Sequence, residues 1–218
     1  MPMMQTAVSR VRGGRSHDAI AMAVEASKLF ERHGAADNRL LVAGVAGEMT
    51  GTHVFTTEWE NGEAWGEFND GLTSDAELEA LLNRARSDDS PVEIVSMSLG
   101  NEIPLGRSGS RTRGSVVEAY ISRCLPGRFD GALELAGAAF DFVEAHGGTN
   151  CRLIQLNSAG TLTDCLVASW ELENVKAAGR LGDAYANDPD GQRVFEMLTG
   201  ANAPVTPVSS GIYREIPL

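Results

Sequence analysis

Apolar and polar residues in the first hundred positions alternate between a period of two and a period near 3.6. The run AVSRV is β-prone, and from about Asp18 to Arg32 apolar side chains recur at helical spacing. Two β-prone runs, RLLVAGVA and THVFTTEW, flank a glycine-rich break that indicates a hairpin. Residues 61–86 are helix-prone in two pieces, and Pro91 opens the run VEIVSMSL. The pattern predicts strand, helix, strand, strand, helical region, strand, or βαββαβ.

The second half of the chain shows the same order of patterns. It reads VVEAYISRC, a helix from about Phe129 to Ala145, RLIQLN, DCLVASWEL, a helical region broken near Asp188, and a strand after Pro204. The segment Glu-Ile-Pro-Leu at 102–105 returns at 215–218, a shift of 113 residues. Without a gap, roughly thirty of about a hundred aligned positions are identical, which indicates a duplicated domain.

The repeated pattern predicts an α+β fold of two tandem ferredoxin-like βαββαβ units. Each unit would have a four-stranded antiparallel sheet with helices on one face, which leaves the other face apolar and uncovered. We expect the two units to pack sheet to sheet and enclose an α/β-barrel within one chain. The predicted boundaries are 1–105 for the first repeat, 106–114 for a linker and 115–218 for the second repeat.

Composition restricts the partners of this fold. The net charge of −12 argues against a nucleic-acid partner, which needs a dense cationic surface. The one basic stretch, GRSGSRTRG, has the glycine and serine content of a flexible linker and contains Arg107, Arg111 and Arg113. No apolar run approaches the length of a membrane span, and the N-terminus lacks the apolar core of a signal peptide. We therefore expect a cytoplasmic protein.

The sequence lacks familiar signatures of cofactor and metal sites. Three cysteines, Cys124, Cys151 and Cys165, have no ligand-like spacing and are expected to be buried thiols. No phosphate loop, dinucleotide fingerprint, nucleophile elbow or zinc-protease motif is present. We expect no metal and no tightly bound cofactor.

The βαββαβ pattern, its doubling and the short polar segment between the copies resemble the dimeric α/β-barrel superfamily, and within it NIPSNAP-like proteins. The resemblance covers the whole chain at the level of fold. The superfamily includes cofactor-free monooxygenases, polyketide cyclases, small isomerases, haem enzymes of the chlorite-dismutase type and members without known activity. The resemblance therefore implies a fold but leaves the reaction open. Because superfamily members also associate further, a homodimer is an open expectation.

Strand alternation indicates which side chains face the barrel interior. In DCLVASWEL the apolar set should face the helices, namely Leu166, Ala168, Trp170 and Leu172. The alternate set, which includes Glu171, would face inward, and Glu58 is its counterpart in the first unit. By the same logic we expect Gln155 and Asn157 to point inward. An error of one residue in register would reverse all these assignments.

Glu58 and Glu171 are the candidate catalytic residues, because a carboxylate on an inner sheet face suits a general base. The structural alternative is that they form ion pairs with Arg10 and Arg123. A third interpretation is that these arginines hold an anionic substrate oxygen.

Other polar and aromatic residues have a structural and a functional interpretation. Tyr120 could line a cavity for an aromatic ligand, although packing explains such residues more often. His33 and His146 each precede a glycine at a predicted helix end, where we expect a capping role. Arg39 and Arg152, each at the start of a strand, are expected to be surface charges.

Two functions follow as hypotheses. The first is a protein that binds a small organic molecule in the barrel cavity and acts as a cofactor-independent monooxygenase, cyclase or isomerase on an aromatic or polyketide-like substrate. Arg10, Arg123, Tyr120, Gln155 and Asn157 would bind the substrate. The alternative is a non-catalytic assembly or ligand-sensing protein of NIPSNAP-like type, and a minor alternative is a haem-binding barrel. Whether the protein is an enzyme is left open by the sequence.

Overall fold

The first half of the chain forms four strands and three helices. The computed structural model describes residues 1–72, 74–107, 113 and 116–218. The elements of this half are β1 (Met3–Val11), α1 (Ser16–Arg32), β2 (Asp37–Val45), β3 (His53–Trp59), α2 (Gly62–Gly71), α3 (Ala76–Arg86) and β4 (Val92–Ile103), with a 3₁₀ turn at Gly47–Met49. Asn61 and Asp75 cap α2 and α3 by accepting backbone N–H bonds, which is why the helical region divides there.

The second half repeats these elements. They are β5 (Val116–Cys124), α4 (Phe129–Ala145), β6 (Thr149–Ser158), β7 (Cys165–Leu172), α5 (Val175–Asn187), α6 (Pro189–Thr199) and β8 (Val205–Ile216), with a 3₁₀ turn at Gly160–Leu162. Asn174 caps α5 as Asn61 caps α2. Strand β5, helix α4 and strand β8 begin 113 residues after β1, α1 and β4, the shift found in the sequence.

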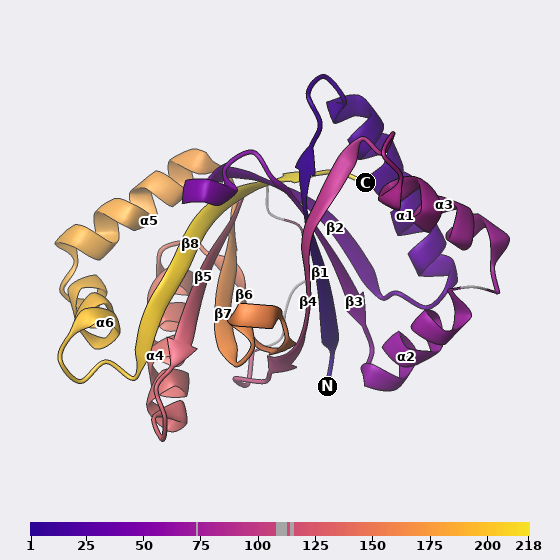
Figure 1. The fold of residues 1–218 in the computed structure, drawn as a ribbon. Coiled ribbons are helices and arrows are strands. Elements are labelled where there is room, and N and C mark those ends of the chain that lie inside the picture. The colour runs from indigo at the N-terminus through magenta and orange to yellow at the C-terminus, as the bar shows by residue number, and fades with distance from the viewer. Residues whose placement is uncertain (73, 108–112, 114–115) are drawn as a thin grey trace.

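The eight strands close into one barrel in the order β1-β3-β2-β8-β5-β7-β6-β4 (Figure 1). Each half supplies four consecutive antiparallel strands, and the halves join where β2 pairs with β8 and β4 with β6. At the second junction the backbones approach closely, because a Cβ on Gly100 would lie 2.6 Å from the Gln155 carbonyl oxygen. The predicted α+β fold of two ferredoxin-like units closed into one barrel is confirmed.

The helices cover the outside of the barrel, α1–α3 over the first half and α4–α6 over the second (Figure 1). Leu166, Trp170 and Leu172 of β7 pack with buried residues of α4 and α5, including Phe140 and Leu181. The predicted alternation of β7, with its apolar set toward the helices, is correct.

The inside of the barrel holds a smaller apolar cluster and two groups of charged residues. The apolar cluster joins Ile154, Leu156 and Cys165. Partly buried side chains from β1, β5 and β7 pack against it, namely Met4, Ile121 and Val167. The interior is therefore filled in part by hydrocarbon and in part by the ion pairs described next.

Arginine–carboxylate pairs cross between the two halves. Arg39 of β2 is paired with Glu171 of β7, and its repeat counterpart Arg152 of β6 is paired with Glu58 of β3. Arg152 also donates to Glu102, with 2.7 Å between Nη2 and Oε2. Each half thus supplies the cation for a carboxylate of the other half.

The crossed pairs correct one expectation from the sequence. Arg39 and Arg152 are not surface charges, since Arg39 is only 9% exposed and both lie among barrel carboxylates. Glu171 is 2% exposed, so its charge is compensated within the protein. Removing one member of such a buried pair leaves an uncompensated charge, which typically costs about 3–5 kcal/mol.

Arg10 and Arg123 are not the partners of these carboxylates. Glu58 lies opposite Met4 on β1, whereas Arg10 lies opposite Glu93 near the other end of that strand. Likewise Arg123 lies opposite Cys165, at the far end of β7 from Glu171, and donates to the carbonyls of Thr161 and Thr163. The predicted pairs fail because the strands place the two charges at opposite ends.

The predicted linker falls partly outside the described residues, which omit 108–112 and 114–115 and thus Arg111. Its flanking arginines are fixed to the barrel and a helix. Arg107 pairs with Asp141 and Glu144 of α4, and Arg113 pairs with Asp37 and Glu215 at the β2–β8 junction. The boundaries 1–105, 106–114 and 115–218 stay predictions.

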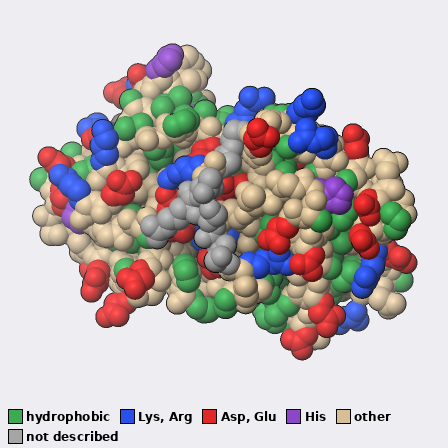
Figure 2. All heavy atoms as spheres, turned by 180° about the vertical axis from the view of Figure 1, so that it is seen from behind, with side chains coloured by type: hydrophobic (Ala, Val, Ile, Leu, Met, Phe, Trp, Pro, Cys, Tyr) green, Lys and Arg blue, Asp and Glu red, His purple; other side chains and the backbone are tan. Residues whose placement is uncertain are grey.

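The surface carries both signs of charge. Figure 2 shows acidic side chains spread over one face of the molecule with basic ones between them, and the whole chain carries a net charge of −12. Among the helices of the described residues, none has both the length and the apolar character needed to cross a bilayer.

We predict that Arg39→Met lowers the free energy of unfolding by about 3–5 kcal/mol, because it removes the cation that faces Glu171. Chemical denaturation followed by circular dichroism measures this. The matched control is Arg84→Met, which breaks a pair with Glu25 whose side chains are 53% and 45% exposed. We expect about 1 kcal/mol or less from the control. Equal losses in both variants would contradict a structural role of the crossed pairs.

Candidate functional site

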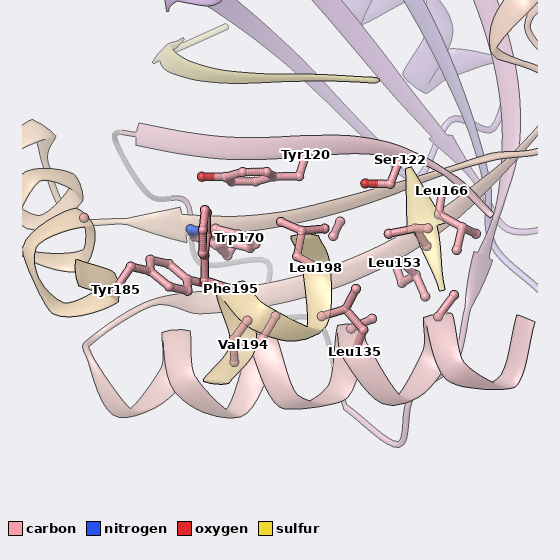
Figure 3. Close-up of a pocket in the computed structure, with 16 residues that line it drawn as sticks. Tyr120, Ser122, Leu135, Leu153, Leu166, Trp170, Tyr185, Val194, Phe195 and Leu198 are labelled. Atoms are coloured by element: carbon pink, nitrogen blue, oxygen red, sulfur yellow. The ribbon is translucent and has the colours of Figure 1, made fainter. Parts of the chain in front are cut away.

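A cavity of about 290 Å³ lies between the sheet of the second half and helices α4–α6 (Figure 3). Strands β5, β6 and β7 form one wall, and the helices form the other. The lining residues are Tyr120, Ser122, Ala132, Leu135, Ala136, Ala139, Leu153, Leu166, Ala168, Trp170, Gly182, Tyr185, Val194, Phe195, Leu198 and Val205. We call this space the second-half cavity. Its size is near the lower end of ligand cavities, about 300–1,000 Å³.

Aromatic side chains gather at one end of the second-half cavity. Figure 3 shows Tyr120, Trp170, Tyr185 and Phe195 at this end, and Ser122, Leu153 and Leu166 at the other. The Tyr120 and Trp170 rings are stacked, with centroids 5.3 Å apart and an interplanar angle of 22°. Phe195 is 59% exposed, so it borders the solvent side of the cavity. Such a surface suits a flat, apolar ligand.

A buried carboxyl group lies behind the aromatic end. Glu118 of β5 is 7% exposed and accepts a hydrogen bond of 2.9 Å from Trp170 Nε1. Burial raises the pKa of Glu118, and the Trp170 hydrogen bond only partly opposes this. A carboxyl group with a raised pKa can accept or release a proton nearer neutral pH than an exposed one.

The two cavity tyrosines are hydrogen-bond donors. Burial raises the pKa of Tyr120 and of Tyr185, and the nearby Glu118 charge raises both further. Both hydroxyls therefore remain protonated, and neither has a hydrogen-bond partner among the described side chains. They can donate to an oxygen of a bound molecule and stabilise negative charge that develops there.

A second cavity, of about 400 Å³, lies at the equivalent place in the first half, between its sheet and helices α1–α3. We call it the first-half cavity. The aromatic and acidic residues of the second half are absent at its equivalent positions, where Ala7 replaces Tyr120 and Thr57 replaces Trp170. The two halves therefore offer ligands different surroundings.

The structure separates the substrate-binding residues expected from the sequence. Tyr120 lines the second-half cavity, but Gln155 and Asn157 do not point into the barrel. Ile154 and Leu156 of the same strand occupy the interior, so the alternate residues face outward. Asn157 is exposed and donates to Asn101. The predicted inward orientation of Gln155 and Asn157 is wrong. Strand β6 has apolar residues on both faces, so the alternation of polar and apolar residues does not indicate which face is inside.

The other site residues predicted from the sequence lie away from both cavities. Glu58 and Glu171 are inside the barrel in ion pairs, on the opposite side of the sheet from the cavities. Arg10 and Arg123 are exposed near strand ends. A catalytic role for the two glutamates therefore stays a prediction, and the geometry gives the ion pair as their observed state.

The repeated histidines lie at helix ends. His33 is the C-cap residue of α1, and its Nε2 is 2.8 Å from Asp75 Oδ2. His146 is the C-cap residue of α4, and its Nδ1 is 2.9 Å from the Phe142 carbonyl oxygen. Among the described residues, no group of three or more His, Cys, Asp and Glu side chains has the arrangement of a metal site.

Comparison with known proteins identifies solved structures of similar fold but no protein of similar sequence. No protein-family profile matches the chain, and no curated protein matches it. An anthrone oxidase-like protein of known structure has a TM-score of 0.66 at 12% identity, over 99% of this chain and 91% of that one. A candidate monooxygenase from Fusobacterium nucleatum subsp. nucleatum has a TM-score of 0.63 at 8% identity, over 99% and 93%.

A variant chlorite dismutase from Candidatus Nitrospira defluvii has a TM-score of 0.57 at 8% identity, over 99% of this chain and 92% of that one. At such identities the comparisons show a shared dimeric α/β-barrel fold. The NIPSNAP-like resemblance stays a prediction.

The chlorite dismutase likeness raises the question of haem. Haem iron is held by His, Cys, Met or Tyr. The second-half cavity is lined by no His, Cys or Met, and the raised pKa values of Tyr120 and Tyr185 disfavour the phenolate that would bind iron. In the first-half cavity His53 is the first residue of β3, at one end of the space, whereas an axial ligand must lie over the middle of the porphyrin. The residues that line the second-half cavity do not fit haem.

Sequence reasoning missed Glu118. One feature of the sequence could have pointed to Glu118. The two halves differ at this position, because its repeat counterpart in β1 is Gln5. The missing information was that Trp170, whose repeat counterpart is Thr57, stands directly opposite Glu118 across the strands.

We predict that Glu118→Gln changes the pH dependence of stability. The folded wild type binds this proton more tightly than the unfolded chain, so it loses stability as pH rises from the ordinary carboxyl range through the raised pKa of Glu118. The amide retains an acceptor for Trp170 but does not titrate. Urea unfolding from about pH 4 to about pH 8 should show that the free energy of unfolding of the variant rises relative to that of wild type as the pH increases. The gain is about 1.4 kcal/mol for every tenfold difference in proton affinity between the folded and unfolded chain.

The control for this titration is Glu67→Gln, at an exposed position of α2. It makes the same chemical change at the surface, so a pH-dependent gain equal to that of Glu118→Gln would show that the gain does not come from the buried position of Glu118. A pH-independent difference between Glu118→Gln and wild type would refute the raised pKa.

Proposed function

We propose that this protein is a cofactor-independent enzyme of the monooxygenase type, which oxidises a small, electron-rich aromatic molecule in the second-half cavity. The observation that carries the proposal is a stacked Tyr120–Trp170 pair that lines an apolar cavity, with the buried Glu118 carboxyl group hydrogen-bonded to the Trp170 indole behind that lining. The anthrone oxidase-like protein of similar fold supports the choice of substrate class.

The aromatic end can bind and orient such a substrate. A planar ring system would lie against the Tyr120–Trp170 wall, with Leu135 and Val194 closing the opposite side. A carbonyl oxygen of the substrate would accept from a tyrosine hydroxyl. This hydrogen bond would strengthen as the carbonyl becomes an enolate, which lowers the barrier to losing a proton from the adjacent carbon.

The oxidation needs one proton acceptor and dioxygen. Glu118 would take the proton from a substrate methylene, leaving its electron pair in the enolate. The enolate reduces O₂ and captures it at the same carbon as a hydroperoxide, which regains the proton. Loss of water then leaves a ketone, so that CH₂ plus O₂ gives C=O plus H₂O. Cyclisation or isomerisation would use the same proton removal without O₂.

The test uses anthrone as the probe, with O₂ consumption and anthraquinone absorbance as readouts. Ala136 of α4 lines the second-half cavity, and its repeat counterpart Ala23 of α1 lines the first-half cavity. We predict that Ala136→Phe, which fills the second-half cavity, abolishes anthrone binding and turnover, whereas Ala23→Phe leaves both within about twofold. Glu118→Gln should lower kcat at least about 100-fold with a small change in KM.

The outcomes separate the alternatives. Equal effects of Ala136→Phe and Ala23→Phe, or no consumption of anthrone by folded wild type, would overturn the proposal. Anthrone binding that depends on Ala136 without any turnover would assign the protein to the ligand-sensing alternative of NIPSNAP-like type. Glu58→Gln and Glu171→Gln test the barrel carboxylates. We expect them to lower stability and leave the kcat of the remaining folded protein unchanged.

Cytoplasmic location and association into a homodimer stay predictions. Size-exclusion chromatography with light scattering measures the second, and neither is needed for the chemistry proposed above.

A further inference from the structure

The first-half cavity has a largely apolar interior. Helix α1 and the sheet supply much of it, and α2 and α3 supply the rest. Its apolar lining includes Ala19, Met22, Ala26, Phe30, Phe55 and Leu81. At about 400 Å³ it is larger than the second-half cavity and falls within the size range of small-molecule sites. A hydrocarbon chain would find no charge along most of this space.

Polar side chains at one end of the first-half cavity already have partners. Gln5 Oε1 accepts a hydrogen bond of 3.0 Å from Trp65 Nε1, and Asn69 Nδ2 donates 2.7 Å to the Trp65 carbonyl oxygen. These contacts satisfy the side chains and tie α2 to β1. This end therefore offers little that would recognise a ligand.

The other end has polar side chains without partners. His53 is 8% exposed, lines the cavity, and makes no hydrogen bond or ion pair with the described residues. Ser9 lies directly opposite it on β1. Arg86, the last residue of α3, lines the same cavity, is exposed, and has no ion-pair partner among the described residues. A buried, unpartnered imidazole in an otherwise apolar space is costly unless something bonds to it.

The repeat shows that these groups are particular to the first half. Leu166 occupies the position of His53 in the second half, and Thr199 occupies the position of Arg86. The second-half cavity thus has its ionisable lining residues, Tyr120 and Tyr185, at the aromatic end, whereas the first-half cavity has His53 and Arg86. One ligand could not suit both.

We propose that the first-half cavity is a second binding site, for a carboxylic acid with a hydrocarbon chain, whose carboxylate is held by Arg86 and His53. The guanidinium supplies the charge that an anion needs in a chain of net charge −12. The imidazole N–H of His53 donates to a carboxylate oxygen, and burial keeps the pKa of His53 low, so the free site holds a neutral ring. The chain would extend along Met22 and Phe30 toward Phe68.

The test is isothermal titration of the folded wild type with decanoate, and with decanol as the uncharged probe of equal chain length. We expect decanoate to bind at one site per chain and decanol to bind at least about tenfold more weakly. Arg86→Thr and His53→Leu, which insert the residues found in the second half, should each weaken decanoate at least about tenfold and change decanol little. Ala23→Phe should abolish both, and Ala136→Phe should change neither.

Each remaining outcome counts against the site. No decanoate binding by wild type, or equal losses with Ala23→Phe and Ala136→Phe, would overturn it. If haemin gives a Soret band with the wild type and none with His53→Leu, the ligand of this cavity is haem and the carboxylic acid proposal is wrong. Arg86 is exposed, so Arg86→Thr should fold even if His53→Leu does not, and decanoate binding unchanged by it would also reject the proposal. None of these titrations measures anthrone turnover, so failure here leaves the proposed reaction intact.

Discussion

The fold depends on arginines that each half of the chain extends to carboxylates of the other. A four-stranded sheet with helices on one face must cover its other face, and here each sheet covers the other by closing an eight-stranded barrel. The two sheets are joined along their edges, where β2 pairs with β8 and β4 with β6. The pairs of Arg39 with Glu171 and of Arg152 with Glu58 connect the two halves across the interior of this barrel, and each buried charge depends on the other half for its compensation.

The side chains that fill the barrel interior restrict where ligands can bind. The barrel is occupied by ion pairs and by the cluster around Ile154, and the two cavities proposed as ligand sites lie between the sheet and the helices. The barrel fixes the sheet, and each set of helices can then diverge without disturbing the closure. Glu118 and Trp170 in one half, and His53 and Arg86 in the other, are differences of this kind.

Much of the fold was predictable from the sequence, and the candidate site was mostly not. The repeat predicted the order of the elements and the closed barrel. The alternation of apolar residues in β7 predicted that Trp170 faces the helices. The Arg39–Glu171 pair was missed because its members are 132 residues apart, although Arg39, Glu58 and Glu102 each recur after 113 residues. Gln155 was misplaced because β6 is apolar on both faces. Glu118 was missed because its burial depends on Trp170 and on helices packed over β5, although its difference from Gln5 in the repeat marked the position.

The crossed pairs also bear on how such a chain arises. Arg39 and Arg152 are equivalent positions, as are Glu58 and Glu171, so a single half has both the cation and the carboxylate needed to pair with an identical copy. Two separate half-length chains could thus assemble the same barrel by twofold symmetry, with two identical cavities. Joining the copies removes that symmetry requirement. A mutation can then alter one cavity and spare the other, which lets one small protein acquire two chemistries.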